Sequence, residues 1–209
     1  MTSGQADRPK QGFARHFVTD RRRFNLSIED LIERAASAAR RGATVVQVRE
    51  RDLPDRDLAA LVRRVRQAVS GTAARVLVND RADLAMAAGA DGVHLRADSA
   101  IASRVRGMVP AGFILGRSVH SMADVDAAAL DGACDYLLFG TVFPSTGKPE
   151  GHPIAGLDAL RLACARTAIP IIAIGGMTEQ RALQAMQAGA AGFAAVDLFI
   201  GLTPLPEVV

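Results

Sequence analysis

A histidine and two hydroxyl residues stand close together in the stretch 116–121, Gly-Arg-Ser-Val-His-Ser. Ser118 and His120 are two positions apart, soon after the apolar run 113–115, so an extended chain turns both side chains to the same side. A histidine beside hydroxyl groups at a strand's carboxyl end can take up and release a proton near neutral pH. The pattern predicts an acid–base site, and the alternative that His120 merely caps the next helix stays open.

Three further residues are suited to binding an anion. Gly175 and Gly176 follow an apolar run and precede a helical pattern capped by Thr178, so their backbone N–H groups can face a phosphate. Lys148 is the only lysine outside the polar N-terminal stretch, and it lies beside hydroxyl residues in the long loop 140–149. Plainer interpretations also stay open, since two glycines make a tight turn and a loop lysine can simply be solvated.

These residues need a scaffold that brings distant segments together, and the chain shows eight apolar runs that alternate with helical patterns. Near-continuous apolar strands are typical of a parallel sheet covered on both faces. Eight strand–helix repeats therefore predict an α/β fold, a single-domain (β/α)₈ TIM barrel. The alternative, an open doubly wound sheet, lacks the Gly-x-Gly-x-x-Gly pattern after its first strand. The expected strands span 16–20, 44–49, 75–78, 91–95, 113–115, 136–139, 170–174 and 193–196.

The ends of the chain differ from this repeating pattern. Residues 1–12 are polar and are predicted to form a disordered tail, which leaves residues 13–209 for the barrel domain. After Phe199 only ten residues remain, with Pro204 and Pro206 among them, so we expect a reduced C-terminal helix. The expected helices span about 27–42, 54–69, 99–106, 122–130, 157–166 and 178–189, with a short alanine-rich helix that ends at Gly89.

Polar residues stand at the carboxyl ends of most of the expected strands. In a TIM barrel these ends converge on one mouth, the face where active sites lie. The pattern therefore predicts an enzyme or a protein that binds a small ligand. His94 has two open interpretations, a residue of the mouth or a satisfied core histidine. The polar strand ends are Asp20, Gln47, Arg49, Asn79, Asp80, His94, Ser118, His120 and Asp197.

Composition narrows the class of protein further. The formal charge of +3 comes from arginines interleaved with acidic residues, without the one-sided basic stripe and aromatic residues of a nucleic-acid binder. The sequence has no apolar run of membrane-spanning length and no signal peptide, so we expect a cytoplasmic protein that binds neither membrane nor nucleic acid. Cys134 and Cys164 are expected to be reduced, buried thiols.

Several motifs taken together resemble the thiamine-phosphate synthase / thiazole tautomerase superfamily of barrels, in order from about residue 17 to residue 199. The resemblance implies two alternative activities. The synthase branch couples hydroxymethylpyrimidine diphosphate to thiazole phosphate with Mg²⁺, whereas the tautomerase branch shifts a proton on a thiazole phosphate carboxylate without a metal. The motifs are residues 47–51 (Gln-Val-Arg-Glu-Arg), 78–83 (Val-Asn-Asp-Arg-Ala-Asp), 89–95 (Gly-Ala-Asp-Gly-Val-His-Leu), Asp135 and Tyr136 with Gly140 and Pro144, and 173–176 (Ala-Ile-Gly-Gly).

Resemblance to the synthase branch implies one set of site residues and one conflict. Gln47, Arg49, Asn79, Ser118 and Lys148 would bind the pyrimidine diphosphate, and Asp80 would bind Mg²⁺. The synthase pattern Gly-Gln-x-Asp after the fourth strand is replaced here by residues 96–99, Arg-Ala-Asp-Ser, so Asp98 stands one position early for a second metal ligand. Arg51 also stands where synthases usually carry lysine.

Resemblance to the tautomerase branch is closer at residues 116–121 and 174–178, and we expect a thiazole tautomerase-like isomerase without a cofactor. His120 would be the acid–base residue with Ser118 beside it. Asp197 departs from both branches, which carry serine there, because a carboxylate repels a phosphate. In this interpretation the substrate-binding residues are Gln47, Arg49, Arg51, Asn79, His94, Lys148, Gly175, Gly176, Val196 and Asp197.

Two alternatives to the tautomerase remain. One is the Mg²⁺-dependent synthase, with Asp80 and Asp98 as metal ligands, and the other is a barrel that binds thiamine precursors without turnover. All three interpretations share a small phosphorylated heterocycle as ligand. The resemblance is also compatible with a homodimer, which no pattern in this chain demonstrates.

Overall fold

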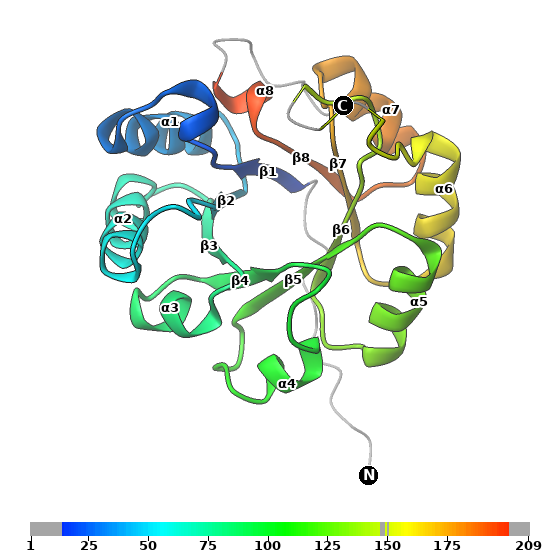
Figure 1. Cartoon of the computed structure of the whole chain (residues 1–209), viewed down its shortest axis with the longest axis horizontal. Coiled ribbons are helices and arrows are strands. Elements are labelled where there is room, and N and C mark those ends of the chain that lie inside the picture. The colour runs from blue at the N-terminus through cyan, green and yellow to red at the C-terminus, as the bar shows by residue number, and fades with distance from the viewer. Residues whose placement is uncertain (1–13, 147–148, 150, 201–209) are drawn as a thin grey trace.

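The computed structural model describes residues 14–146, 149 and 151–200, and its strands form one closed parallel barrel in chain order. Figure 1 shows the barrel end-on, with the helices arranged around it and the last strand beside the first. The predicted (β/α)₈ TIM barrel is confirmed. Its strands are β1 (Ala14–Val18), β2 (Val45–Val48), β3 (Arg75–Asn79), β4 (Gly92–Leu95), β5 (Ile114–Val119), β6 (Tyr136–Phe139), β7 (Ile171–Ile174) and β8 (Gly192–Ala195).

Three helices begin at the hydroxyl residues that precede them. The side chains of Ser27 and Ser121 each accept a hydrogen bond from the amide of an aspartate three residues later, and Thr178 accepts one from the amide of Arg181. Each such cap is worth about 1 kcal/mol of helix stability. The helices are α1 (Ile28–Arg40), α2 (Asp55–Ala68), α3 (Ala82–Ala87), α4 (Ala102–Arg106), α5 (Met122–Asp131), α6 (Gly156–Arg166), α7 (Glu179–Gln187), α8 (Asp197–Ile200) and the 3₁₀ turn η1 (Arg22–Phe24).

The two ends of the chain carry predictions that fall largely outside the described residues. The expected tail, residues 1–12, lies there, and so do residues 201–209. Within the described part α8 covers residues 197–200, and the expectation of a reduced last helix concerns residues outside it.

Alternate residues of each strand divide between two environments. The outward set, which includes Phe17, Leu137 and Phe193, is fully buried between the barrel and the helices. Each such side chain contributes about 1.5–3 kcal/mol through its burial. The inward set packs inside the barrel as a smaller apolar cluster, to which Leu77 and Ile172 belong. This arrangement aims the last inward residue of each strand at the mouth.

Strand β5 is longer than the apolar run that predicted it. The expected strand ended at Leu115, but β5 continues to Val119 because β4 pairs with it as far as Arg117 and β6 as far as Val119. Ser118 therefore lies within the strand rather than in a loop. Gly116 is needed at this point, since a Cβ atom there would lie 2.1 Å from a ring carbon of Tyr136, inside the barrel.

Two expectations from composition can be compared with the structure. Both cysteines are free thiols, as expected: Cys134 is buried and Cys164 is half-buried. Among the described residues, no helix is both long enough and apolar enough to span a membrane.

Candidate active site

One cavity of about 500 Å³ opens at the carboxyl ends of the strands, the face where TIM barrels carry their active sites. Asp80 does not line this cavity, and Lys148 lies outside the described residues. The other residues predicted from the sequence come together around it, and they are Gln47, Arg49, Arg51, Asn79, His94, Asp98, Ser118, His120, Gly175, Gly176, Val196 and Asp197.

The floor of the cavity carries a pair of amide side chains. Nε2 of Gln47 donates a hydrogen bond of 3.1 Å to Oδ1 of Asn79 from the neighbouring strand. The Gln47 side chain is buried, and on its other side a hydrogen bond from it raises the pKa of His16. Asn79 is only half-buried, so the amide group of this pair that faces the cavity can form hydrogen bonds with a polar ligand.

His94 lies beside this pair and joins two hydroxyl groups. Its Nδ1 atom is 2.8 Å from the hydroxyl oxygen of Tyr136, and its Nε2 atom is 2.8 Å from that of Ser118. Burial lowers the pKa of His94 well below its ordinary value and raises that of Tyr136, so both groups are neutral near pH 7. His94 is thus a satisfied interior histidine that also lines the cavity, and both interpretations left open by the sequence hold.

A second interior histidine was not singled out from the sequence. His16 on β1 is buried, and the centre of its ring lies 5.6 Å from that of Tyr136. Burial lowers its pKa to about 3, against a smaller opposite effect of a hydrogen bond with the Gln47 side chain. The available signal was its spacing of two from Val18, which turns both side chains into the barrel.

His120 stands at the edge of the cavity with its ring fixed in one orientation. Its Nδ1 atom lies 2.6 Å from the carbonyl oxygen of Gly140, which can only accept, so Nδ1 carries the hydrogen and donates it. In the neutral ring, Nε2 is then the nitrogen that can accept a proton. The carboxylate of Asp124 accepts a hydrogen bond from the His120 amide, which joins this position to the start of α5.

The rim carries four arginines and three aspartates among the described residues. A terminal nitrogen of Arg49 lies 3.6 Å from the Asp20 carboxylate, and one of Arg23 lies 2.7 Å from that of Asp197. Burial, followed by the charge of Arg51, lowers the pKa of Arg49. The arginines thus crowd one another at this rim, and crowded cations favour the binding of an anion.

The Gly175–Gly176 turn lies against the loop that follows β6. Both glycines have positive φ angles, 108° and 60°. A Cβ atom on Gly176 would lie 2.2 Å from the carbonyl oxygen of Pro144, and one on Gly175 would lie 2.5 Å from the Thr141 side chain. Glycine is therefore required at both positions, and the turn lines the cavity.

The two carboxylates that resemblance assigns to Mg²⁺ do not fit a metal site. Oδ1 of Asp80 accepts a hydrogen bond from the Ser99 hydroxyl, and Oδ2 lies 3.8 Å from the guanidinium of Arg96. Asp98 is ion-paired with the same guanidinium. The described residues include no cluster of three or more side chains suited to a metal ion. A cation already lies where these two carboxylates meet, so the assignment of Asp80 and Asp98 to Mg²⁺ is not supported by this donor set.

Two rim residues, Arg23 and Arg96, were missed as site residues from the sequence. Arginine is common throughout the chain, so neither stands out by type. Their positions held the usable signal, since Arg23 follows the first strand and Arg96 directly follows Leu95 at the end of the fourth.

Comparison with known proteins assigns the barrel to a family. Residues 15–199 match the family described as thiamine monophosphate synthase. A thiamine-phosphate synthase from Methanoculleus marisnigri is 40% identical over 167 residues, which cover 80% of this chain and 79% of that protein. A putative thiamine-phosphate synthase from Geobacter sulfurreducens is 38% identical, and the match covers 91% of this chain and 88% of that protein.

A solved structure agrees with these relatives. The thiamine phosphate pyrophosphorylase from Pyrococcus furiosus superposes with a TM-score of 0.77 at 30% identity. The superposition covers 92% of this chain and 90% of that one. The preference for the tautomerase branch is not supported, because these relatives carry the name of the synthase branch. The barrel, its cavity and these similarities lead to one conclusion: the chain belongs to the thiamine monophosphate synthase family.

Proposed function

We propose that the protein is a thiamine-phosphate synthase, which couples hydroxymethylpyrimidine diphosphate to thiazole phosphate and releases diphosphate. The observation that carries the proposal is a cavity at the barrel mouth with a hydrogen-bonding floor and an arginine-lined rim, in a chain related to named synthases. A flat polar heterocycle is suited to such a floor, and a diphosphate is suited to such a rim. The proposal replaces the tautomerase expected from the motifs.

The floor would recognise the pyrimidine. The amide groups of the floor would form hydrogen bonds with an amino-substituted ring. Ser118, held by His94, and Asn79, held by Gln47, would contact further polar atoms of the same ring. Because His94 stays neutral, it would orient the Ser118 hydroxyl rather than attract the diphosphate.

The rim would bind the diphosphate and assist its departure. In the coupling step, the bond from the pyrimidine's methylene carbon to the diphosphate oxygen breaks, and the thiazole nitrogen forms a bond to that carbon. The electron pair of the broken bond leaves with the diphosphate. Arg49 and Arg51 line the cavity, and their guanidinium groups would stabilise the negative charge that develops on the leaving oxygen.

The opposite wall would hold the thiazole phosphate. The backbone of Gly175 and Gly176 would bind its phosphate, and Val196 would pack against the ring. Lys148 stays a proposed phosphate ligand from the resemblance. Asp197 is compatible with this placement because Arg23 already neutralises its charge.

A thiazole tautomerase is the second candidate, and the geometry of His120 favours it. With Nδ1 bound to the carbonyl of Gly140, Nε2 would take a proton from carbon and return it to another position of the ring. The synthase reaction does not require this transfer, so the two candidates differ in their need for His120.

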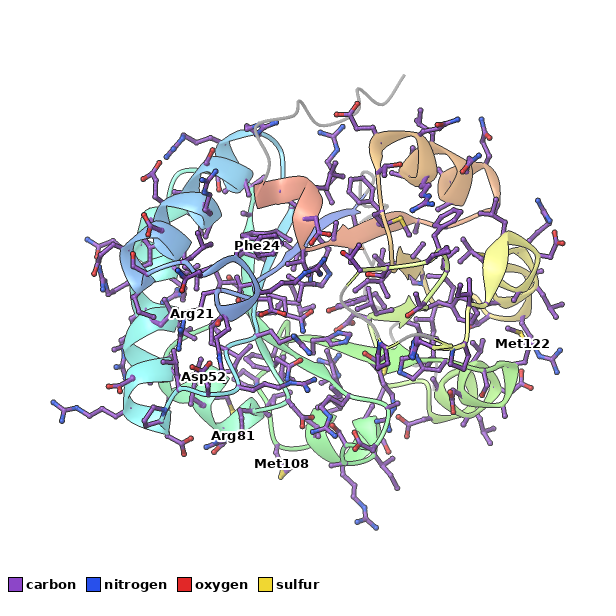
Figure 2. The ribbon with its side chains drawn as sticks, turned by 45° about the horizontal axis from the view of Figure 1, so that its top comes forward. Arg21, Phe24, Asp52, Arg81, Met108 and Met122 are labelled. Atoms are coloured by element: carbon purple, nitrogen blue, oxygen red, sulfur yellow. The ribbon has the colours of Figure 1, made fainter. Side chains whose placement is uncertain are left out.

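The deciding experiment incubates the purified chain with both synthase substrates, with Mg²⁺ and separately with EDTA, and measures thiamine phosphate and diphosphate by chromatography. We expect thiamine phosphate and diphosphate to form in equal molar amounts. Arg49→Gln should slow their formation about a hundredfold. Arg81→Gln is the matched control: Arg81 is ion-paired with Asp55 and Asp83 on the outside of the barrel near α3 (Figure 2) and should keep the wild-type rate.

Two outcomes would overturn the synthase. Isomerisation of thiazole phosphate carboxylate without coupling, lost in His120→Asn, would establish the tautomerase. Binding of both synthase substrates with neither reaction would establish a binding protein.

A further inference from the structure

The carboxylate of Asp80 forms its contacts with the loop between β4 and α4 and does not line the cavity. Its Oδ1 atom accepts hydrogen bonds from the Ser99 hydroxyl and, at 3.4 Å, from the backbone amide of Arg96. Its Oδ2 atom faces the guanidinium of Arg96 at 3.8 Å. Both oxygens are thus engaged by one loop, and Asp80 is absent from the cavity wall that Arg96 and Asp98 help to form.

The same loop, residues 96–100, is fastened from its other side by Arg117 on β5. The guanidinium of Arg117 donates to the carbonyl oxygen of Ala100 at 2.9 Å and to that of Ala97 at 2.7 Å, with a longer contact of 3.3 Å to Ser99. The Ser99 hydroxyl also accepts the Arg96 amide at 3.0 Å. A loop held by two neighbouring strands presents its first side chain in a defined position.

That first side chain is Arg96, which puts a cation between two carboxylates at the edge of the cavity. The Asp98 carboxylate is 70% exposed, so its ion pair with the guanidinium is weak and it can turn away. The positive charge of Arg96 also helps to lower the pKa of Arg49, after the larger effects of burial and of Arg51. The three guanidinium groups therefore act on the same region of the cavity.

A guanidinium in this position has the chemistry to receive a diphosphate. It is planar, always charged, and can donate two parallel hydrogen bonds to phosphate oxygens. A divalent ion placed between Asp80 and Asp98 would have to displace it, because the carboxylates can satisfy only one cation in that space. An anion bound at this end of the cavity would therefore contact nitrogen donors rather than a metal ion.

We propose that Arg96 is a built-in cation that binds the diphosphate of the substrate directly, at the position where a synthase of this family would hold a metal ion between Asp80 and an aspartate after β4. The inference rests on the proposed function for the identity of the anion, and it adds a binding residue and a metal-independent mode of binding. Asp80 is then a positioning residue for the loop, and Asp98 is an exchangeable counterion that the diphosphate replaces.

The test is calorimetric titration of the purified chain with inorganic diphosphate, in EDTA and separately with Mg²⁺. We expect the wild type to bind diphosphate in EDTA, and we expect Arg96→Gln to weaken that binding about ten- to a hundredfold, the effect of losing one charged hydrogen-bonding group. Arg81→Gln is the matched control. Arg81 also has two aspartate partners and a similar exposure, 40% against 44%, but lies outside the cavity. The Arg81→Gln variant should bind diphosphate with the affinity of the wild type.

Two results would overturn the inference: wild-type binding that appears only when Mg²⁺ is added, or an Arg96→Gln affinity equal to that of the wild type. The comparison of wild-type binding in EDTA and in Mg²⁺ uses the unchanged protein, so it tests the inference even if the Arg96→Gln variant does not fold. A titration with Mn²⁺ alone adds a second check, since a micromolar site that is lost in Asp80→Asn would also overturn the inference.

The coupling assay separates this inference from the proposed function. Arg96-dependent diphosphate binding in EDTA, in a protein that forms no thiamine phosphate, would remove the synthase and leave the anion site standing. Formation of thiamine phosphate that needs Mg²⁺ and is unchanged in Arg96→Gln would confirm the synthase and remove the inference.

Discussion

The carboxylate of Asp197 accepts a hydrogen bond of 2.7 Å from Arg23, a residue 174 positions earlier in the chain. The same nitrogen of Arg23 donates to the hydroxyl of Thr146 at 2.7 Å. Arg23 thus joins the turn after β1 to the end of β8 and to the loop after β6. The repulsion between Asp197 and a phosphate that the sequence predicts is reduced, because the carboxylate has its own counterion.

Replacing this carboxylate should strengthen phosphate binding. In Asp197→Ser, Arg23 loses its carboxylate partner and can face the anion, and one repulsive interaction of about 1 kcal/mol disappears. We expect the KM for thiazole phosphate to fall about fivefold, with less than about 1 kcal/mol lost in unfolding free energy because the pair is partly exposed. Steady-state kinetics and urea unfolding measure the two effects.

The control for this change is Asp158→Ser, which removes an aspartate paired with Arg161 at 2.6 Å on the outside of α6. It should leave KM unchanged. A rise in KM for Asp197→Ser would contradict the placement of the phosphate beside this residue.

The buried histidine of β1 should make the fold sensitive to acid. The pKa of His16 is about 3 in the folded chain and 6.5 in the unfolded one, so between these values the unfolded chain binds a proton that the folded chain does not. Stability therefore falls as the pH drops below 6.5, and His16 alone accounts for about 2–3 kcal/mol of loss at pH 4.5. Urea unfolding at pH 7 and pH 4.5 measures the difference.

Two variants identify the source of that acid sensitivity. His16→Phe should lose less stability between the two pH values than the wild type, because one buried titrating group is gone. His152→Gln, at a half-buried position outside the barrel interior, should behave as the wild type does. Equal acid sensitivity in all three proteins would refute the assignment to His16.

The two partners of His94 should have separable roles. Ser118→Ala and Tyr136→Phe each leave one ring nitrogen of a buried imidazole without a partner, so each should cost about 1–3 kcal/mol of unfolding free energy. Only Ser118 lines the cavity, so only Ser118→Ala should also weaken binding of the pyrimidine diphosphate. Calorimetric titration of both variants checks this, and an equal loss of affinity in the two would mean that Ser118 acts only through the fold.

A methyl group at Gly176 should disable the anion-binding turn. Gly176→Ala places a Cβ atom 2.2 Å from the carbonyl oxygen of Pro144 at a φ angle of 60°, so backbone must move. We expect a loss of several kcal/mol in stability and at least a tenfold rise in the KM for thiazole phosphate. Thermal unfolding and steady-state kinetics measure both.

Gly71→Ala is the matched comparison, because Gly71 also has a positive φ angle, 82°, but no atom lies within 4 Å of its Cβ position. It should cost only about 1 kcal/mol through backbone strain and leave KM unchanged. Equal effects at the two positions would show that backbone strain, rather than the contact with Pro144, sets the cost.

The barrel and most of the cavity wall could be predicted from local pattern. Apolar runs and breakers located all eight strands, and the spacing of two between Ser118 and His120 placed both side chains on the cavity. The end of β5 was misplaced because Gly116 and Arg117 are weak strand formers, and pairing with β4 and β6 outweighs that preference.

What escaped prediction depends on contacts between distant residues. The partner of Asp197 is an arginine at the other end of the chain, and Asp80 is turned from the cavity by a serine and an arginine of the next loop. No local pattern specifies such pairs. The resemblance supplied the role of Asp80 as a metal ligand, and the replacement of Gly-Gln-x-Asp by residues 96–99 was the available warning.

The contact between the Gly175–Gly176 turn and the loop at Thr141 and Pro144 also limits how this barrel can change over evolutionary time. Neither glycine can gain a side chain without displacing the other loop, so single substitutions at these two positions cannot adjust the turn. Other parts of the cavity are lined by side chains such as Arg51, Arg96 and Arg23, which can be exchanged one at a time. Divergence toward new substrates in this lineage should therefore be recorded in the loops after β1, β2 and β4, with the β7 end inherited unchanged.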